Sequence, residues 1–166
     1  MPQYTTRFGR LLDYQKGGVE AIDDEPEHYA FSNMFEVAAN AKAWEKVAVG
    51  KNQEYVLEVI RAEGTSEWRT AAHDETALVM DGTVTVELVK LDQPEVPADQ
   101  RGSVRIDEVP PKGRAMGRIV ARRGHMALLP AGAAYRFKAD EPGVILLQTI
   151  EGDDTIYRWA EIIQTG

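Results

Sequence analysis

The sequence predicts an all-β protein of the jelly-roll type, in which short antiparallel strands wrap into a barrel. Three observations predict this fold: segments rich in β-branched and aromatic residues, turn signals between them, and a spaced set of Gly and Pro residues in the C-terminal half. Many short strands separated by turns are typical of sandwiches and jelly rolls. The expected strands cover residues 55–61, 76–80, 84–89, 116–121, 125–129, 133–138, 144–150 and 155–162.

The pair Asp81 and Gly82 lies between two of these segments, 76–80 and 84–89. In the second segment apolar residues alternate with Thr and Glu, as on a strand with one buried face. An Asp-Gly pair between such segments favours a type I′ turn. The pattern therefore predicts a β-hairpin at this point.

One short helix is expected before the barrel. Residues 38–46 are rich in Ala, Lys and Glu, which have high helix propensity. Asn40 could cap this helix, and Gly50 is suited to end it.

The domain organisation is simple. Residues 1–30 carry many charges and several aromatic rings without a regular period, which predicts an extended arm. Its rings indicate an arm laid over a surface, either that of its own barrel or that of a partner. Residues 31–166 are expected to form a single barrel domain. Within it, residues 92–115 contain four prolines and two glycines and should form a long loop.

Composition excludes several classes of function. The chain has 27 Asp and Glu against 19 Lys and Arg, and the resulting net charge of −8 opposes binding to nucleic acid. Without cysteine there is no disulfide framework and no thiolate nucleophile. There is no apolar signal segment, and no apolar run approaches the roughly 20 residues that span a bilayer. We therefore expect a soluble, cytoplasmic protein that binds neither nucleic acid nor membrane.

Gly and Pro residues form a spaced frame between residues 124 and 139: Gly124, Pro130, Gly132 and then Tyr135. Gly124 permits a tight turn, Pro130 ends a ladder because it has no N–H to donate, and Gly132 allows a positive φ. This spacing resembles the second conserved motif of the cupin β-barrels. In that motif Tyr135 stands where a metal-binding cupin has a histidine.

The first cupin motif is also incomplete. Glu75 precedes Gly82 by seven positions, which matches the glutamate and the closing glycine of that motif. The resemblance would place two histidines within residues 68–71, but these read Trp-Arg-Thr-Ala. With Tyr135 in place of the third histidine, most of the expected ligands are missing, and one carboxylate does not hold a divalent ion tightly. We therefore expect no metal-binding, cofactor-binding or catalytic residue in this chain.

His73, Glu75 and Tyr135 remain as candidate cavity residues. His73 and Glu75 are two positions apart, which places them on one face if they belong to a strand. They could form a hydrogen-bonded pair or, together with His125 or Tyr135, a metal site of unusual composition. A third alternative is an acid–base pair of His73 with Tyr135 that acts on a sugar. The three tryptophans could stack on a flat ligand but are more typical of a core or interface: Trp44, Trp68 and Trp159.

Several longer stretches carry a more specific resemblance. Residues 23–37 read DDEPEHYAFSNMFEV, residues 44–52 read WEKVAVGKN, residues 61–66 read RAEGTS, and residues 71–75 read AAHDE. These stretches resemble the small subunit of the two-component hydroquinone 1,2-dioxygenases, and the similarity extends over most of the chain.

The resemblance implies a hetero-oligomer of small and large cupin subunits, for example two of each. It also implies that Fe(II) and ring cleavage belong to the large subunit, which opens hydroquinone with dioxygen to 4-hydroxymuconic semialdehyde during degradation of 4-nitrophenol and related aromatics. This chain would then be a noncatalytic subunit that stabilises and shapes its partner. Two alternatives stay open: a freestanding metal-free cupin acting on a small carbohydrate or carboxylate through His73, Glu75 and Tyr135, and a ligand-binding barrel without chemistry.

Overall fold

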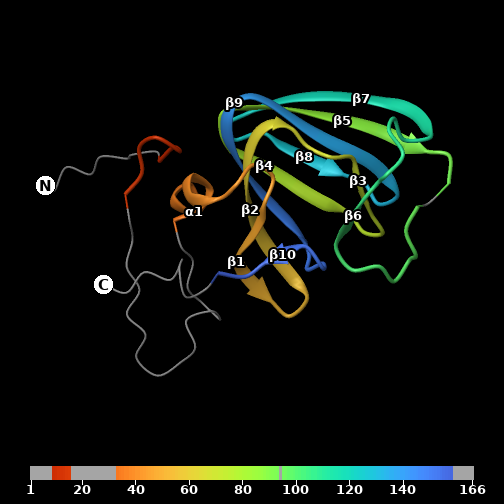
Figure 1. Ribbon diagram of the computed structural model, residues 1–166, viewed down its shortest axis with the longest axis horizontal. Coiled ribbons are helices and arrows are strands. Elements are labelled where there is room, and N and C mark those ends of the chain that lie inside the picture. The colour runs from red at the N-terminus through yellow and green to blue at the C-terminus, as the bar shows by residue number, and fades with distance from the viewer. Residues whose placement is uncertain (1–8, 16–32, 94, 159–166) are drawn as a thin grey trace, which may run out of the picture.

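The computed structural model shows a barrel of β-strands with one short helix on its outside (Figure 1). It describes residues 9–15, 33–93 and 95–158. The fold is the jelly roll of the cupins, as the sequence predicts. In chain order the elements are α1 (Met34–Asn40), β1 (Lys46–Asn52), β2 (Tyr55–Thr65), β3 (Arg69–Ala71), β4 (Glu75–Asp81), β5 (Thr83–Leu91), β6 (Ser103–Arg105), β7 (Gly113–Arg122), β8 (Met126–Leu129), β9 (Ala133–Ile150) and β10 (Thr155–Ile156).

Strand β9 organises the barrel because it pairs with four other strands. Its residues 143–150 pair with β2 and β4, whereas its residues 133–139 pair with β3, β5 and the end of β2. The sequence predicts two strands here, residues 133–138 and 144–150, but the structure joins them into one strand of 18 residues. β10 is shorter than the predicted 155–162, whose last four residues lie outside the described part of the chain.

The hairpin predicted at Asp81 and Gly82 is wrong. β4 and β5 do not pair with each other; both lie along β9, with Asp81 opposite Val144 and Thr85 opposite Lys138. The chain therefore turns a corner at Gly82 and does not reverse there. Gly82 has a φ of 78°, and a Cβ at this position would lie 2.9 Å from the Cα of Gly143. Because both partners at this corner are glycines, two backbones can approach closely.

The helix forms, but not in the expected residues. α1 starts after Asn33, whose side chain accepts a 3.0 Å hydrogen bond from the N–H of Phe35 and so caps the helix. Residues 46–50, which were expected within or beside the helix, form a buried part of β1. Burial of apolar side chains such as Val47 against β2 outweighs the helix propensity of the neighbouring Ala and Lys residues.

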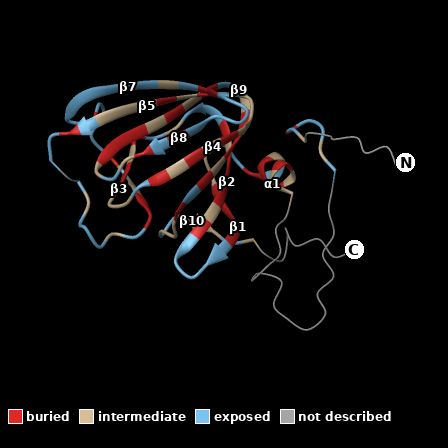
Figure 2. Ribbon diagram, turned by 180° about the vertical axis from the view of Figure 1, so that it is seen from behind, coloured by how far each residue is buried: buried red, intermediate tan, exposed pale blue. Residues whose placement is uncertain are grey.

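Three apolar clusters in the described residues hold the fold together, and the smallest contains Trp68, Leu91, Ile106 and Ala134. The first fills the barrel with residues such as Val86, Phe137 and Leu147. The second lies outside β1, β2 and β9, where α1 covers them with Phe35 and Val37. Figure 2 shows buried residues along the inner strands and exposed ones along most of β7. The barrel therefore has a packed interior and one long strand with little cover.

Most of the predicted arm, residues 1–30, lies outside the described residues. In the described part, Leu11 is buried, and its N–H donates a 2.8 Å hydrogen bond to Asp81. Within residues 92–115, expected to form one long loop, the structure forms β6 and the start of β7, and β6 pairs with β3. No helix in the described residues is long and apolar enough to cross a membrane.

Candidate functional site

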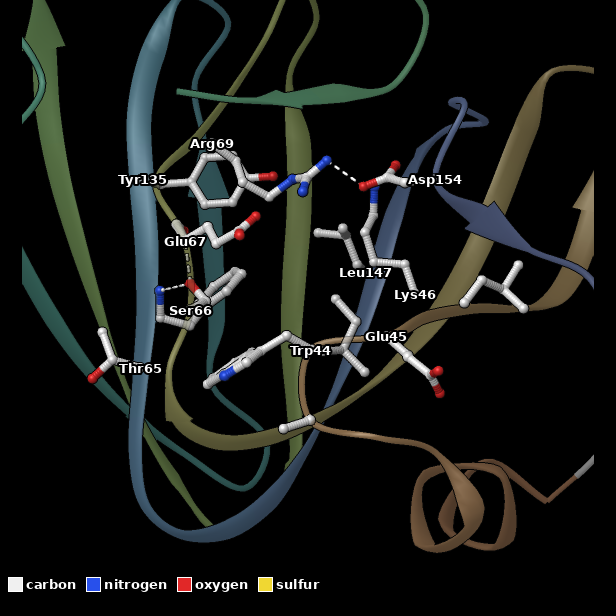
Figure 3. A pocket seen from close by; sticks show the side chains of 14 residues that line it. Trp44, Glu45, Lys46, Thr65, Ser66, Glu67, Arg69, Tyr135, Leu147 and Asp154 are labelled. Carbon is white, nitrogen blue, oxygen red and sulfur yellow. Dashed lines mark hydrogen bonds and ion pairs between the residues drawn. The ribbon is translucent and has the colours of Figure 1, made fainter. Parts of the chain in front are cut away.

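A cavity of about 420 Å³ opens at one end of the barrel (Figure 3). Its lining comes from the start of β1, the end of β2, β3, β9 and the turn before β10. The volume lies within the usual range for small-molecule sites, about 300 to 1,000 Å³.

Aromatic and aliphatic side chains form one part of the cavity wall. Trp44 and Phe137 lie nearly parallel, with ring centroids 6.2 Å apart and an interplanar angle of 10°. Phe137 also contacts Tyr135 at 5.4 Å, and the buried side chain of Leu147 completes this wall. Trp44 has a φ of 66°, which is unusual for a residue with a Cβ, and its N–H donates to the carbonyl of Arg61 at 3.0 Å. The fold therefore holds the Trp44 ring at the cavity despite an unfavourable backbone conformation.

Charged side chains form the opposite edge of the cavity. Asp154 contacts two cations there: its Oδ1 accepts a 3.0 Å hydrogen bond from Lys46 Nζ, and its Oδ2 accepts one from Arg69 Nη2. Arg69 Nε also donates to the hydroxyl of Ser103 at 2.9 Å. Figure 3 shows Arg69 and Asp154 joined across the top of the cavity, with Trp44 below them. One carboxylate thus bridges two cations at the barrel mouth.

Glu58 lies behind this charged edge and is fully buried. Its Oε1 accepts a 2.6 Å hydrogen bond from Thr155, and its Oε2 lies 3.5 Å from Lys46 Nζ without a hydrogen-bond partner in the described residues. Burial raises the pKa of Glu58 because the charged form loses its water, although the Lys46 cation opposes this shift. Lys46 therefore faces one exposed and one buried carboxylate.

A chain of hydrogen bonds runs through the barrel interior from Tyr135. The Tyr135 hydroxyl donates to Glu75 at 2.6 Å, and the Thr149 hydroxyl donates to the other oxygen of Glu75 at 2.7 Å. His73 Nε2 lies 2.9 Å from Thr149 Oγ1. His73 and Glu75 thus meet through Thr149, because His73 lies in the bend before β4 and not on the strand itself. Nδ1 of His73 is buried without a hydrogen-bond partner in the described residues.

The environment of Tyr135 keeps its hydroxyl protonated. Burial, followed by the negative charge of Glu75, raises the pKa of Tyr135 well above its usual value. A phenol of this kind donates a hydrogen bond to Glu75 but does not readily give up its proton near neutral pH. This counts against acid–base chemistry by His73 and Tyr135.

The glycines and proline of the sequence frame lie at turns of the barrel. Gly124 has a φ of 85° between β7 and β8, and Gly132 has a φ of 72° between β8 and β9. Pro130 directly follows the end of β8, and the N–H of Gly132 donates to the carbonyl of Ala71 at 2.8 Å.

His125 is exposed in the turn after β7, where its Nδ1 accepts a 3.0 Å hydrogen bond from Arg122 N–H. Its ring bonds do not join the network around Glu75, and His28 lies outside the described residues.

Sequence reasoning missed the charged edge of the cavity. Arg69 falls within residues 68–71, where the first cupin motif has histidines, and it lies opposite Tyr135 in the β3–β9 ladder. Opposite residues of a ladder point to one face, but the register of β3 against β9 comes only from the structure. No sequence signal marks Lys46 and Asp154, which are 108 positions apart.

The cavity does not fit a metal ion. No group of three or more His, Cys, Asp or Glu side chains in the described residues could hold one. Glu75 already accepts hydrogen bonds from Tyr135 and Thr149, and the Arg69 guanidinium at the cavity would repel a divalent cation.

Solved hydroquinone 1,2-dioxygenases contain a chain that matches this one over nearly its whole length. In the enzyme from Sphingomonas sp. TTNP3 with 4-hydroxybenzoate bound, that chain is 60% identical, with a TM-score of 0.90 and coverage of 98% of this chain and 99% of that chain. This chain belongs to the hydroquinone 1,2-dioxygenase family. Another member, PnpCD in complex with Cd²⁺ and 4-hydroxybenzonitrile, has a chain 52% identical, with a TM-score of 0.88 and coverage of 98% of both chains.

The same two dioxygenases contain a second, longer chain of related fold. In PnpCD in complex with Fe³⁺, a chain 11% identical matches 87% of this chain but only 40% of its own length, with a TM-score of 0.60. A chain of the Sphingomonas enzyme in complex with 4-nitrophenol gives 12% identity, the same coverages and a TM-score of 0.59. Identity this low shows a shared fold only. Within its family the present chain corresponds to the shorter of the two chain types, whereas no family model and no curated protein matches it.

Proposed function

We propose that this chain is the noncatalytic small subunit of an Fe(II)-dependent hydroquinone 1,2-dioxygenase. The assembled enzyme would open hydroquinone with dioxygen to 4-hydroxymuconic semialdehyde. The observation that carries the proposal is the hydrogen bond between Tyr135 and Glu75, because it joins two positions that hold a metal in metal-binding cupins. Arg69 adds a fixed positive charge at the same cavity. In this proposal Fe(II) and the aromatic substrate bind to the longer partner subunit.

The outer surface of the barrel supports a role in assembly. In the described residues, β7 pairs only with β5 and β8 pairs only with β4, so each leaves one edge open. Large apolar side chains are exposed on these two strands: Met116, Val120, Met126 and Leu128. We infer that this surface contacts the longer subunit, and that the small subunit stabilises and shapes it through that contact.

Reconstitution tests the proposal. The full-length chain, its longer partner and the mixture are loaded with Fe(II) under anaerobic conditions, and iron content and hydroquinone-dependent oxygen uptake are measured for each. We expect iron and activity to follow the longer chain, with activity highest in the mixture. Ring cleavage by the present chain alone at the rate of the mixture would overturn the proposal.

A substitution at Glu75, which accepts hydrogen bonds from Tyr135 and Thr149, tests separately whether this barrel binds metal. Glu75→Gln removes the one carboxylate that occupies a cupin ligand position, and Glu141→Gln is the matched control at an exposed position. We expect the iron content of the complex to be the same in wild type and both variants. A loss of iron in Glu75→Gln alone, with the complex still assembled, would show that this barrel binds metal after all.

A further inference from the structure

We propose that the mouth of this barrel binds a small aromatic carboxylate, with Arg69 holding the carboxylate and Trp44 lying beside the ring. The inference does not depend on the proposed subunit function. It rests on three features of the cavity: the hydrogen-bond donors of Arg69, the apolar wall that contains Trp44, and the carboxylate of Asp154.

Arg69 has donor capacity that the described residues do not use. Its Nε donates to the Ser103 hydroxyl, and its Nη2 donates to the Ser103 carbonyl at 2.8 Å and to Asp154. These bonds fix the plane of the guanidinium, while Nη1 has no hydrogen-bond partner in the described part of the chain. A planar guanidinium held in this way is suited to a carboxylate, which accepts two parallel hydrogen bonds.

Asp154 shows that a carboxylate fits this position. It bridges Lys46 and Arg69 at the cavity edge, yet its side chain is 41% exposed. Asp154 belongs to a short turn in which Gly152 N–H donates to the hydroxyl of Thr155 at 2.9 Å. An incoming carboxylate would compete with Asp154 for the same two cations. Asp154 therefore acts as an internal competitor, and its removal should favour the ligand.

The rest of the cavity suits an aromatic ring. Figure 3 shows the Trp44 ring below the charged edge, with Leu147 at the side. Trp44, Phe137 and Leu147 present apolar surface to the cavity, and aromatic faces stack favourably on a flat ligand. The charged edge and the Trp44 ring thus lie at opposite ends of the cavity. This arrangement matches a ligand with a carboxylate at one end and an aromatic ring at the other. Glu45 and Glu67 line the cavity, and Glu58 and Glu75 contact the lining residues Lys46 and Tyr135. These carboxylates disfavour a ligand that carries more than one negative charge.

Calorimetric titration of the full-length chain with three probes tests the site. Benzoate has both ring and charge, benzamide keeps the shape without the charge, and acetate keeps the charge without the ring. We expect saturable binding of one benzoate per chain with a Kd of about 1 mM or lower, and at least about tenfold weaker binding of benzamide and acetate. Absence of saturable benzoate binding, or equal affinity for benzamide, would overturn the proposal.

Two substitutions with opposite expected effects on benzoate affinity test whether benzoate binds in this cavity. Asp154→Asn should tighten benzoate binding severalfold because the competitor is gone. Arg69→Lys should weaken it at least about tenfold, because the charge remains but the planar fork is lost. The matched control is Glu151→Gln: Glu151 also bridges two cations, Lys51 at 2.7 Å and Arg101 at 2.8 Å, but outside the cavity.

We expect Glu151→Gln to leave the affinity for benzoate unchanged. If Glu151→Gln and Asp154→Asn tighten binding equally, the gain is a general effect of charge and the assignment to the cavity is wrong. Thermal unfolding of each variant checks that it is folded. Because Asp154→Asn is predicted to gain affinity, a folding defect in the Arg69 variant does not remove the test. Iron content and ring cleavage by the complex report on the subunit function separately.

Discussion

Tyr135 donates a 2.6 Å hydrogen bond to Glu75 inside the barrel, and both side chains are almost completely buried. A cupin that binds metal would place two ligands at these positions. Here the carboxylate is satisfied by two hydroxyl groups, those of Tyr135 and Thr149. The interior of this barrel has therefore become a hydrogen-bonded structural element, which several measurements can test.

Substitution Tyr135→Phe should destabilise the fold. It removes one donor to Glu75 and leaves a carboxylate oxygen buried without that partner, which costs about 1–3 kcal/mol. Urea denaturation of the full-length chain measures the change. The control is Tyr55→Phe, at a tyrosine that is 54% exposed, where we expect no measurable change. Equal stability of the two variants would mean that the buried bond contributes nothing.

Stability should fall in alkaline solution through Tyr135. The pKa of Tyr135 is raised in the folded state, so the unfolded chain loses this proton near pH 10 while the folded chain keeps it. The contribution of Tyr135 to the free energy of unfolding is therefore complete below about pH 10. It is lost as the pH rises toward the pKa of Tyr135 in the folded state, and the free energy of unfolding then falls by up to about 1.4 kcal/mol per pH unit. Burial also raises the pKa of Tyr157, so part of the slope will remain in Tyr135→Phe. Unfolding free energies at several pH values should show a shallower alkaline decline for that variant.

Breaking the pair of Lys46 and Glu58 should be costly. Both side chains are buried, and Lys46→Met would leave Glu58 without its cation, a change that typically costs about 3–5 kcal/mol. The double substitution Lys46→Met with Glu58→Leu should recover part of this loss, because no buried charge remains unpaired. Chemical denaturation of the three proteins measures both effects.

The control for this pair is Lys51→Met. Lys51 pairs with Glu151 at the surface, where such contacts contribute at most about 1 kcal/mol. A Lys46→Met variant no less stable than Lys51→Met would contradict the buried-pair argument.

Substitution Leu128→Asp should weaken assembly with the longer subunit while leaving the barrel folded. Leu128 is 55% exposed on β8, so its replacement costs little in the isolated chain, whereas a carboxylate in an apolar interface is strongly unfavourable. We expect the dissociation constant of the complex to rise at least about tenfold, measured by analytical ultracentrifugation. Tyr55→Asp, at a similarly exposed residue of β2, is the control. An unchanged dissociation constant for Leu128→Asp would place the interface elsewhere.

Local sequence patterns predicted most strands because alternation of buried and exposed residues survives in the barrel, as in β5. They failed where a distant partner decided the outcome. The Asp-Gly pair at residues 81 and 82 has the chemistry of a hairpin turn, yet the chain turns a corner because β9 pairs with both β4 and β5. The helix expected over residues 38–46 likewise ends at Asn40, and the chain pairs with β2 from Lys46 onward.

The sequence by itself determined the barrel and the family resemblance, and it predicted that most metal ligands of the cupins are missing, because each depends on residue identity at fixed spacing. Only the tertiary structure decided what occupies the vacated site. Arg69 faces Tyr135 through strand register, Thr149 separates His73 from Glu75, and Asp154 reaches Lys46 from 108 positions away. Such contacts depend on how strands pair across the barrel, and no local pattern encodes the distance between residues so far apart in the chain.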